Sequence, residues 1–148
     1  MIDRVAQHMR VLSMRIRLSV LAIAVILARG AAAQSPSQQS AAKTAVGVWR
    51  GTSTCLVRPS ACNDEVVVFR IAPTKATDTL TIDGRRIVRG EEQEMGVLTC
   101  HFTAPNGPLT CTIPQGTWQF HIRGDSLVGE LRHPDNTKFR DVRTIRAP

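Results

Sequence analysis

Residues 117–123 read TWQFHIR, and apolar and polar side chains alternate along this stretch without interruption. Such alternation predicts a strand with one buried face, here formed by Trp118, Phe120 and Ile122. Shorter runs of the same kind occur on both sides of it. Their apolar residues are Val67, Phe69, Ile71, Leu80, Ile82, Leu98, Phe102, Leu109, Ile113, Leu127 and Leu131. Because no window carries a helical apolar repeat of comparable quality, the sequence predicts an all-β domain.

Turn sequences separate these runs at short intervals. Asp83-Gly84 is predicted as a two-residue hairpin turn, and turns are also expected at 106–108, 114–116, 124–125 and 134–136. Tight turns between about eight or nine short strands imply that successive strands pair antiparallel. Since closure removes exposed strand edges, we expect an antiparallel up-and-down meander closed as a small barrel. A two-sheet β-sandwich is the alternative.

The last segment departs from strict alternation, because Phe139, Val142 and Ile145 are three residues apart. A β-bulge near Asp141 would restore the register of a strand. A short terminal helix is the alternative for this segment.

The N-terminal region has the composition of a secretory signal peptide. An apolar run of eleven residues, Leu18 to Ala28, follows a basic leader and precedes small residues that end at Ala33. The run is too short to span a bilayer, which takes roughly 20 apolar residues. We expect Sec-type export and cleavage after Ala33, and hence a secreted protein, periplasmic or extracellular, with no membrane span after cleavage. A retained N-terminal anchor is the alternative.

Cleavage at that position divides the chain and changes its charge. Residues 34–45 are rich in Ser, Gln and Ala and are predicted to be a flexible tail, and residues 46–148 a single β domain. Residues 1–33 carry five of the 19 Lys and Arg and one of the 12 Asp and Glu, so 14 and 11 remain, a net charge of +3. No basic run is interleaved with aromatic residues, so no nucleic-acid partner is expected.

The four cysteines all follow the predicted cleavage site. Cys100 and Cys111 flank a predicted turn and would face each other across a hairpin, while Cys55 and Cys62 bracket the connection between the first two strands. The spacing therefore predicts the disulfides Cys55–Cys62 and Cys100–Cys111, as is usual in a small exported domain. A metal or redox site is the alternative, but no Cys-x-x-Cys motif or common zinc spacing occurs. We expect no metal and no cofactor.

Residues with catalytic chemistry are present but not in catalytic patterns. His101 and His121 fall on predicted strands, and no serine lies in a Gly-x-Ser-x-Gly motif. The cluster formed by Glu91, Glu92 and Glu94 is predicted to be a solvated loop. We therefore expect a protein that is not an enzyme.

The start of the first predicted strand reads Gly47-Val48-Trp49. A Gly-x-Trp at this place, followed by an antiparallel meander and a basic residue on the last strand, resembles the calycin superfamily, and lipocalin-like barrels in particular. The resemblance implies that Trp49 closes one end of the barrel beneath an arginine of the last strand. Arg143 or Arg146 would fill that role, with Arg143 favoured.

Two hypotheses for function follow, and the sequence identifies neither the ligand nor the partner. In the first, the chain is a non-enzymatic, lipocalin-like binding protein. It would hold a small apolar ligand at a barrel mouth near Trp118, Phe120 and Gly129, where Gly129 is the one expected gap in an otherwise filled interior. In the second, the chain binds an envelope protein, for example as an inhibitor of a protease or lysozyme. The loop of residues 56–61, with Arg58 and Pro59 at its tip, would then be the contact.

Overall fold

A computed structural model describes residues 36–103 and 107–148 of the chain. The predicted signal peptide, residues 1–33, lies outside the described residues, as does Asn106 in one of the predicted turns. The elements are helix α2 (Pro36–Ala45) and strands β1 (Gly47–Cys55), β2 (Glu65–Pro73), β3 (Thr79–Val88), β4 (Glu91–Phe102), β5 (Leu109–Ile113), β6 (Gly116–Arg123), β7 (Ser126–Arg132) and β8 (Lys138–Arg146).

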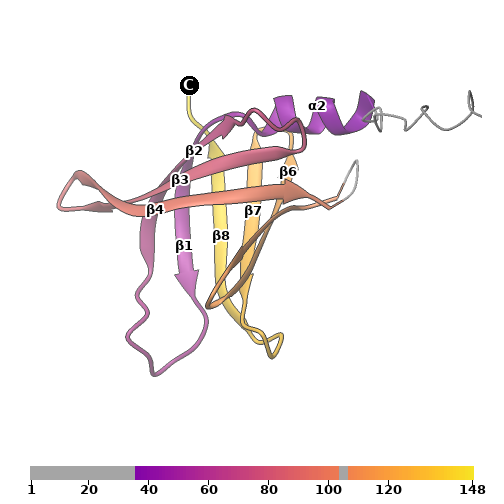
Figure 1. The fold of residues 1–148 in the computed structure, drawn as a ribbon. Helices are drawn as coiled ribbons and strands as arrows, with labels where there is room; N and C mark the ends of the chain where they lie inside the picture. Colours follow the sequence, from indigo (N-terminus) through magenta and orange to yellow (C-terminus); the bar gives the residue numbers. More distant parts are fainter. Residues whose placement is uncertain (1–35, 104–106) are drawn as a thin grey trace, which may run out of the picture. The chain divides into compact units, whose positions relative to one another are not determined.

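Within the described part of the chain, these eight strands form one closed barrel (Figure 1). Each strand is antiparallel to the next along the chain, and β8 pairs with β1 to close the sheet, with Thr52 opposite Arg143. The predicted all-β meander and its closure are therefore confirmed, and the sandwich is not formed. Most of the apolar residues predicted to face inward are buried: Val67, Phe69, Ile71, Leu80, Ile82, Phe102, Leu109, Phe120, Leu127 and Leu131.

One end of the barrel is closed by Trp49, which is fully buried. Its Nε1 donates a hydrogen bond to the carbonyl oxygen of Ala45, at 2.9 Å. The guanidinium of Arg146 lies over the indole ring, with Cζ 4.2 Å from the ring centroid. The residue predicted for this role, Arg143, is exposed instead. Strand alternation explains the correction, because Val142 and Thr144 point inward and the odd-numbered Arg143 between them points outward.

Helix α2 occupies most of the segment that was predicted to be a flexible tail. Its last residue, Ala45, is fully buried, and Ala41 and Ala42 pack against the core. Arg146 donates hydrogen bonds to the carbonyl oxygens of Val46, at 2.9 Å, and of Thr44. The prediction of a flexible tail was wrong because its small alanines fit closely over the barrel end. Trp49 and Arg146 also bind the carbonyl groups at the C-terminus of the helix, which otherwise lack partners.

Strand β3 continues through Asp83-Gly84, which was predicted to be a turn. The turn lies six residues later at Arg89-Gly90, both with positive φ (54° and 89°), between the paired Val88 and Glu91. Two successive residues with φ > 0 are the geometry of a tight hairpin turn. Gly84 is instead a buried residue within the strand, paired with Gly96.

The register of β8 shifts at one residue. Leu131 pairs with Arg140, and the next residue of β7, Arg132, pairs with Lys138, so Phe139 has no partner across the ladder. The β-bulge therefore lies at Phe139 rather than near Asp141, and no terminal helix forms. Beyond the bulge, Ile145 points outward and is 65% exposed.

Both predicted disulfides are present. Cys55 and Cys62 are bonded with their Cα atoms 5.9 Å apart, and Cys100 and Cys111 with theirs 4.2 Å apart. Two disulfides fit an extracellular or periplasmic protein. The second bond joins β4 to β5, whose ladder holds only the pairs His101–Thr110 and Phe102–Leu109.

The cluster of Glu91, Glu92 and Glu94 is part of strand β4 and not a loop. Glu92 forms ion pairs with Arg70 on β2, at 2.8 Å, and with Arg50 on β1, at 3.2 Å. The hydrogen bond from Arg70 lowers the pKa of the Glu92 carboxyl below its ordinary value, and the nearby positive charges act in the same direction. These ion pairs attach the end of the β3–β4 hairpin to strands β1 and β2.

Candidate ligand site

The barrel holds an open cavity of about 310 Å³ at the end opposite Trp49. Its position follows from strand direction, since it is lined near the end of β1, the start of β2, the end of β5 and the start of β6. Most of its wall is apolar. The apolar side chains are Val67, Phe69, Ile82, Met95, Leu98, Ile113, Trp118 and Phe120.

Two glycines create much of this space. Gly84 and Gly96 pair directly across β3 and β4, and both line the cavity. One step further along each strand's inner face, Ile82 and Leu98 fill the corresponding positions with large side chains. The absence of side chains at positions 84 and 96 therefore leaves the cavity open at this level of the barrel.

Gly129, the predicted gap, is not part of the cavity. A Cβ atom at position 129 would lie 2.3 Å from the ring of Phe120. The ring of Phe120, which pairs with Gly129 across the β6–β7 ladder, thus fills the space that a side chain at position 129 would need. The prediction that Gly129 leaves a gap in the interior was wrong, because the ring of Phe120 fills that space.

Trp118 and Phe120, which were predicted as ligand contacts, do lie on the cavity wall. Their rings stack with centroids 5.4 Å apart and an interplanar angle of 10°. Phe69 packs edge-on against Phe120 with a centroid distance of 5.8 Å. Phe120 is buried to 1% exposure, whereas Trp118 is only partly buried and presents its indole at the open end.

One side of the cavity is polar, and we call it the Ser53–Glu65–Arg140 cluster. Its residues come from the adjacent strands β1, β2 and β8. Arg140 Nη1 donates a hydrogen bond to Ser53 Oγ at 2.7 Å and lies 3.0 Å from Glu65 Oε2. Ser53 is 3% exposed, so the cluster faces the interior of the barrel.

Glu65 and Arg140 are not among the site residues predicted from the sequence. A usable signal was the alternation along β8, because Arg140 shares its inward parity with Val142 and Thr144. An arginine at an inward position of a barrel strand needs polar partners or a ligand. The bulge at Phe139 does not disturb this reading, since it lies before Arg140 in the chain.

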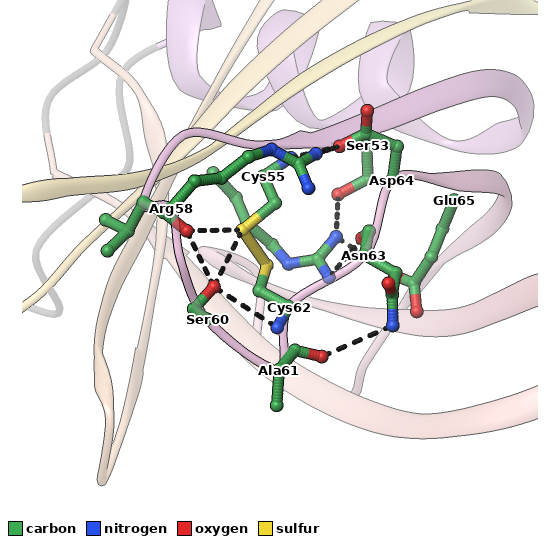
Figure 2. Close-up of a disulfide and its surroundings, with 11 residues drawn as sticks. Ser53, Cys55, Arg58, Ser60, Ala61, Cys62, Asn63, Asp64 and Glu65 are labelled. Carbon is green, nitrogen blue, oxygen red and sulfur yellow. Dashed lines mark hydrogen bonds and ion pairs between the residues drawn. A yellow bond between two sulfur atoms is a disulfide. The ribbon is translucent and has the colours of Figure 1, made fainter.

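The loop between β1 and β2 lies at the end of the barrel away from helix α2 (Figure 1), and Figure 2 shows this loop around the Cys55–Cys62 disulfide. Arg140 Nη2 donates a hydrogen bond to the carbonyl oxygen of Asn63, at 2.9 Å, and the backbone N–H of Cys55 donates one to Asp64, at 2.8 Å. Arg58 and Pro59, the predicted loop tip, are exposed. The exposed guanidinium of Arg58 forms an ion pair with Asp64 at 2.8 Å, within the same loop.

His101 and His121 are not among the residues that line the cavity. His101 lies next to the closed end, where its Nδ1 is 3.0 Å from the hydroxyl of Thr79, and His121 is exposed on the outer face of β6. The hydroxyl of Ser53 accepts a hydrogen bond from Arg140, and no hydrogen bond joins it to a histidine within the described residues.

Residues 36–103 and 107–148 contain no group of three or more His, Cys, Asp or Glu placed to hold a metal ion. Over the same residues, no helix has the length and apolar character needed to cross a membrane.

No protein-family model matches the chain, and no curated protein matches it significantly.

Proposed function

We propose that this chain is a non-enzymatic binding protein of lipocalin-like architecture that holds a small, largely apolar ligand in the open end of its barrel. The observation that carries the proposal is the cavity of about 310 Å³ with an apolar wall. This volume reaches the roughly 300 Å³ at which pockets begin to accommodate small organic ligands. The partly exposed indole of Trp118, stacked on Phe120, supplies a flat apolar surface at the entrance.

The proposed setting is the cell envelope or the extracellular space. The apolar run that ends before Ala33 supports Sec-type export, and both disulfides suit an oxidising compartment. The barrel closed by Trp49 and Arg146 supports the lipocalin-like assignment, because the resemblance implies this arrangement.

The test is calorimetric titration of the mature protein with 1-octanol, a neutral amphipath small enough for the cavity. Gly84→Val places a branched side chain in the cavity, and a Cβ at position 84 meets only ordinary contacts of 3.6 Å or more. We expect this variant to weaken octanol binding by about tenfold or more while its thermal unfolding stays cooperative. Val97→Leu, which adds bulk to the exposed outer face of β4, is the matched control and should bind as the wild type does. Unchanged binding by Gly84→Val would refute the proposed site.

The second candidate function is docking of the loop of residues 56–61 onto an envelope hydrolase. The disulfide and the Arg58–Asp64 ion pair favour it, because they hold the loop in one conformation. The test is capture of a purified lysozyme or protease by wild type and by Arg58→Ala. Equal capture by both would count against this loop as the contact.

A further inference from the structure

We propose that the ligand of the cavity carries a single negative charge and that its acidic group lies against the Ser53–Glu65–Arg140 cluster. This inference rests on the proposed function and specifies the chemical class of the ligand: a monoanionic amphipath, with a carboxylate as the simplest head group.

The first argument is the local charge. Glu65 lies between two arginines, 3.0 Å from Arg140 and 3.5 Å from Arg86. Glu65 and Arg140 line the cavity and compensate each other, and Arg86 lies beside the lining, so one excess positive charge stands next to the polar wall. The side chains of Arg140 and Glu65 are only 13% and 18% exposed, whereas that of Arg86 is 47% exposed, so solvent screens the excess charge in part. One negative charge on a ligand would neutralise the wall.

The second argument is the supply of hydrogen-bond donors. Arg140 has five N–H groups, its hydrogen bonds to Ser53 and Asn63 use two of them, and Nη1 also lies 3.0 Å from Glu65. Ser53 Oγ accepts from Arg140, and its own hydroxyl proton has no acceptor among the described residues. A carboxylate can accept from several donors at once and so matches the spare donors of Arg140 and Ser53.

The third argument excludes the opposite charge. An ammonium group would have to pair with Glu65, whose carboxylate already contacts two arginines. It would also lie close to Arg140, with which it shares a charge sign. A neutral head group would leave the excess positive charge of the wall without a partner. Charge complementarity therefore favours an anion over both.

The fourth argument limits the size of the apolar part. A volume of about 310 Å³ corresponds to about ten water volumes of roughly 30 Å³ each. The ligand is accordingly a compact molecule, of the size of a medium-chain or single-ring monocarboxylic acid. Its apolar body would lie between the backbone wall at Gly84 and Gly96 and the ring of Trp118.

The experiment compares three probes with the same apolar chain and different head groups: octanoate, 1-octanol and octylammonium. Titrations of the mature protein at low ionic strength should give octanoate the tightest binding, by about fivefold or more over octanol, and octylammonium the weakest. Added salt should reduce the advantage of octanoate and leave octanol almost unchanged.

Two variants assign that preference to the cluster. Glu65→Gln removes the negative charge but keeps an acceptor for Arg140, so octanoate should bind about threefold or more tighter and octanol about as before. Ser53→Ala removes one donor and should weaken octanoate selectively. Arg140 itself is a poor choice, because its loss would leave Ser53 and Glu65 without their shared partner.

The outcomes separate this inference from the function on which it rests. Octanol binding as tight as octanoate, with sensitivity to Gly84→Val, would overturn the anion preference and leave the apolar site standing. Tightest binding of octylammonium would also overturn it. No binding of octanol or octanoate would overturn both. Thermal unfolding of each variant distinguishes a lost head-group contact from a lost fold.

Discussion

Arg146 lies over Trp49 at the closed end of the barrel, with Cζ 4.2 Å from the indole centroid, and binds the carbonyl oxygens of Val46 and Thr44. One side chain thereby contacts the barrel core and the end of helix α2. We expect Arg146→Ala to lower the free energy of unfolding by about 1–3 kcal/mol, from the lost cation–π contact and hydrogen bonds. Arg143→Ala, at the exposed position predicted from sequence, should change it by less than about 0.5 kcal/mol. Urea unfolding of both variants checks this difference.

The two inward glycines at positions 84 and 129 should respond differently to added carbon. Gly129→Ala forces a Cβ to within 2.3 Å of the Phe120 ring and should destabilise the fold by about 1–3 kcal/mol. Gly84→Ala meets nothing closer than 3.6 Å and should leave stability within about 0.5 kcal/mol of wild type. Thermal unfolding followed by circular dichroism is the measurement. Equal destabilisation by the two substitutions would contradict the placement of the cavity.

The Glu92 ion pairs predict how stability depends on pH. Contact with Arg70 lowers the pKa of Glu92 in the folded protein below the ordinary value of 4.5, so the fold favours the charged form. Its contribution is complete above the unfolded pKa and is lost as the pH falls through the lowered folded value. The pKa of Glu130 is lowered in the same direction by its hydrogen bond from Arg132.

We therefore expect the urea midpoint of wild type to fall as the pH is lowered from about 5 to 3, and to fall less steeply in Glu92→Gln. Glu91→Gln, which removes a neighbouring charge that no ion pair engages in the described part of the chain, is the control and should follow wild type. Parallel pH curves for wild type and Glu92→Gln would show that the ion pairs contribute nothing.

The Cys100–Cys111 disulfide supports a narrow part of the barrel wall. Only two residue pairs join β4 and β5 in the ladder, against ten between β3 and β4. We expect the Cys100→Ala/Cys111→Ala variant to lose about 2–4 kcal/mol of unfolding free energy and to exchange the β5 amide hydrogens faster. Hydrogen exchange read by mass spectrometry tests both effects. Equally faster amide exchange in all strands would indicate that the variant loses stability globally and that the β4–β5 ladder is not a locally weak part of the barrel.

The disulfide Cys55–Cys62 should affect the ligand site more than the barrel wall. Asn63 and Asp64 follow Cys62 directly and contact Arg140 and the backbone of Cys55. We expect Cys55→Ala/Cys62→Ala to weaken octanoate binding while the amide protection of β6 and β7 is retained. Wild-type affinity in this variant would show that the loop does not support the polar wall.

Local pattern predicted the strands and the disulfides well, because both depend on short-range features. The alternation at 117–123 corresponds to β6, and the short spacing within each cysteine pair favoured a bond across the intervening turn. The error at Asp83-Gly84 has a different origin. Asp-Gly is a strong turn sequence, but Gly84 faces the cavity, and the turn forms at the less distinctive Arg89-Gly90.

The polar wall was harder to find, since its residues are separated by up to 87 positions in sequence, as Ser53 and Arg140 are. Their meeting depends on barrel closure between β1 and β8, which no local window contains. The same closure decides which arginine of β8 covers Trp49. The alternation of inward and outward side chains along β8 could have identified the right residues. It places Arg140 and Arg146 on the inner face and Arg143 on the outer face.

The backbone of Gly84 and Gly96 forms part of the cavity wall, and this affects how the size of the cavity can be altered by substitution. Gly96 has a φ of 131°, which side chains rarely adopt, whereas Gly84 lies in a conformation open to any residue. Substitution of Gly84 by Ala and then by Val would therefore narrow the chamber in single-residue steps, since a Cβ there meets no atom closer than 3.6 Å. On the proposed function, the length of acceptable ligands would then depend on one residue, and the preference for their charge on the Ser53–Glu65–Arg140 cluster.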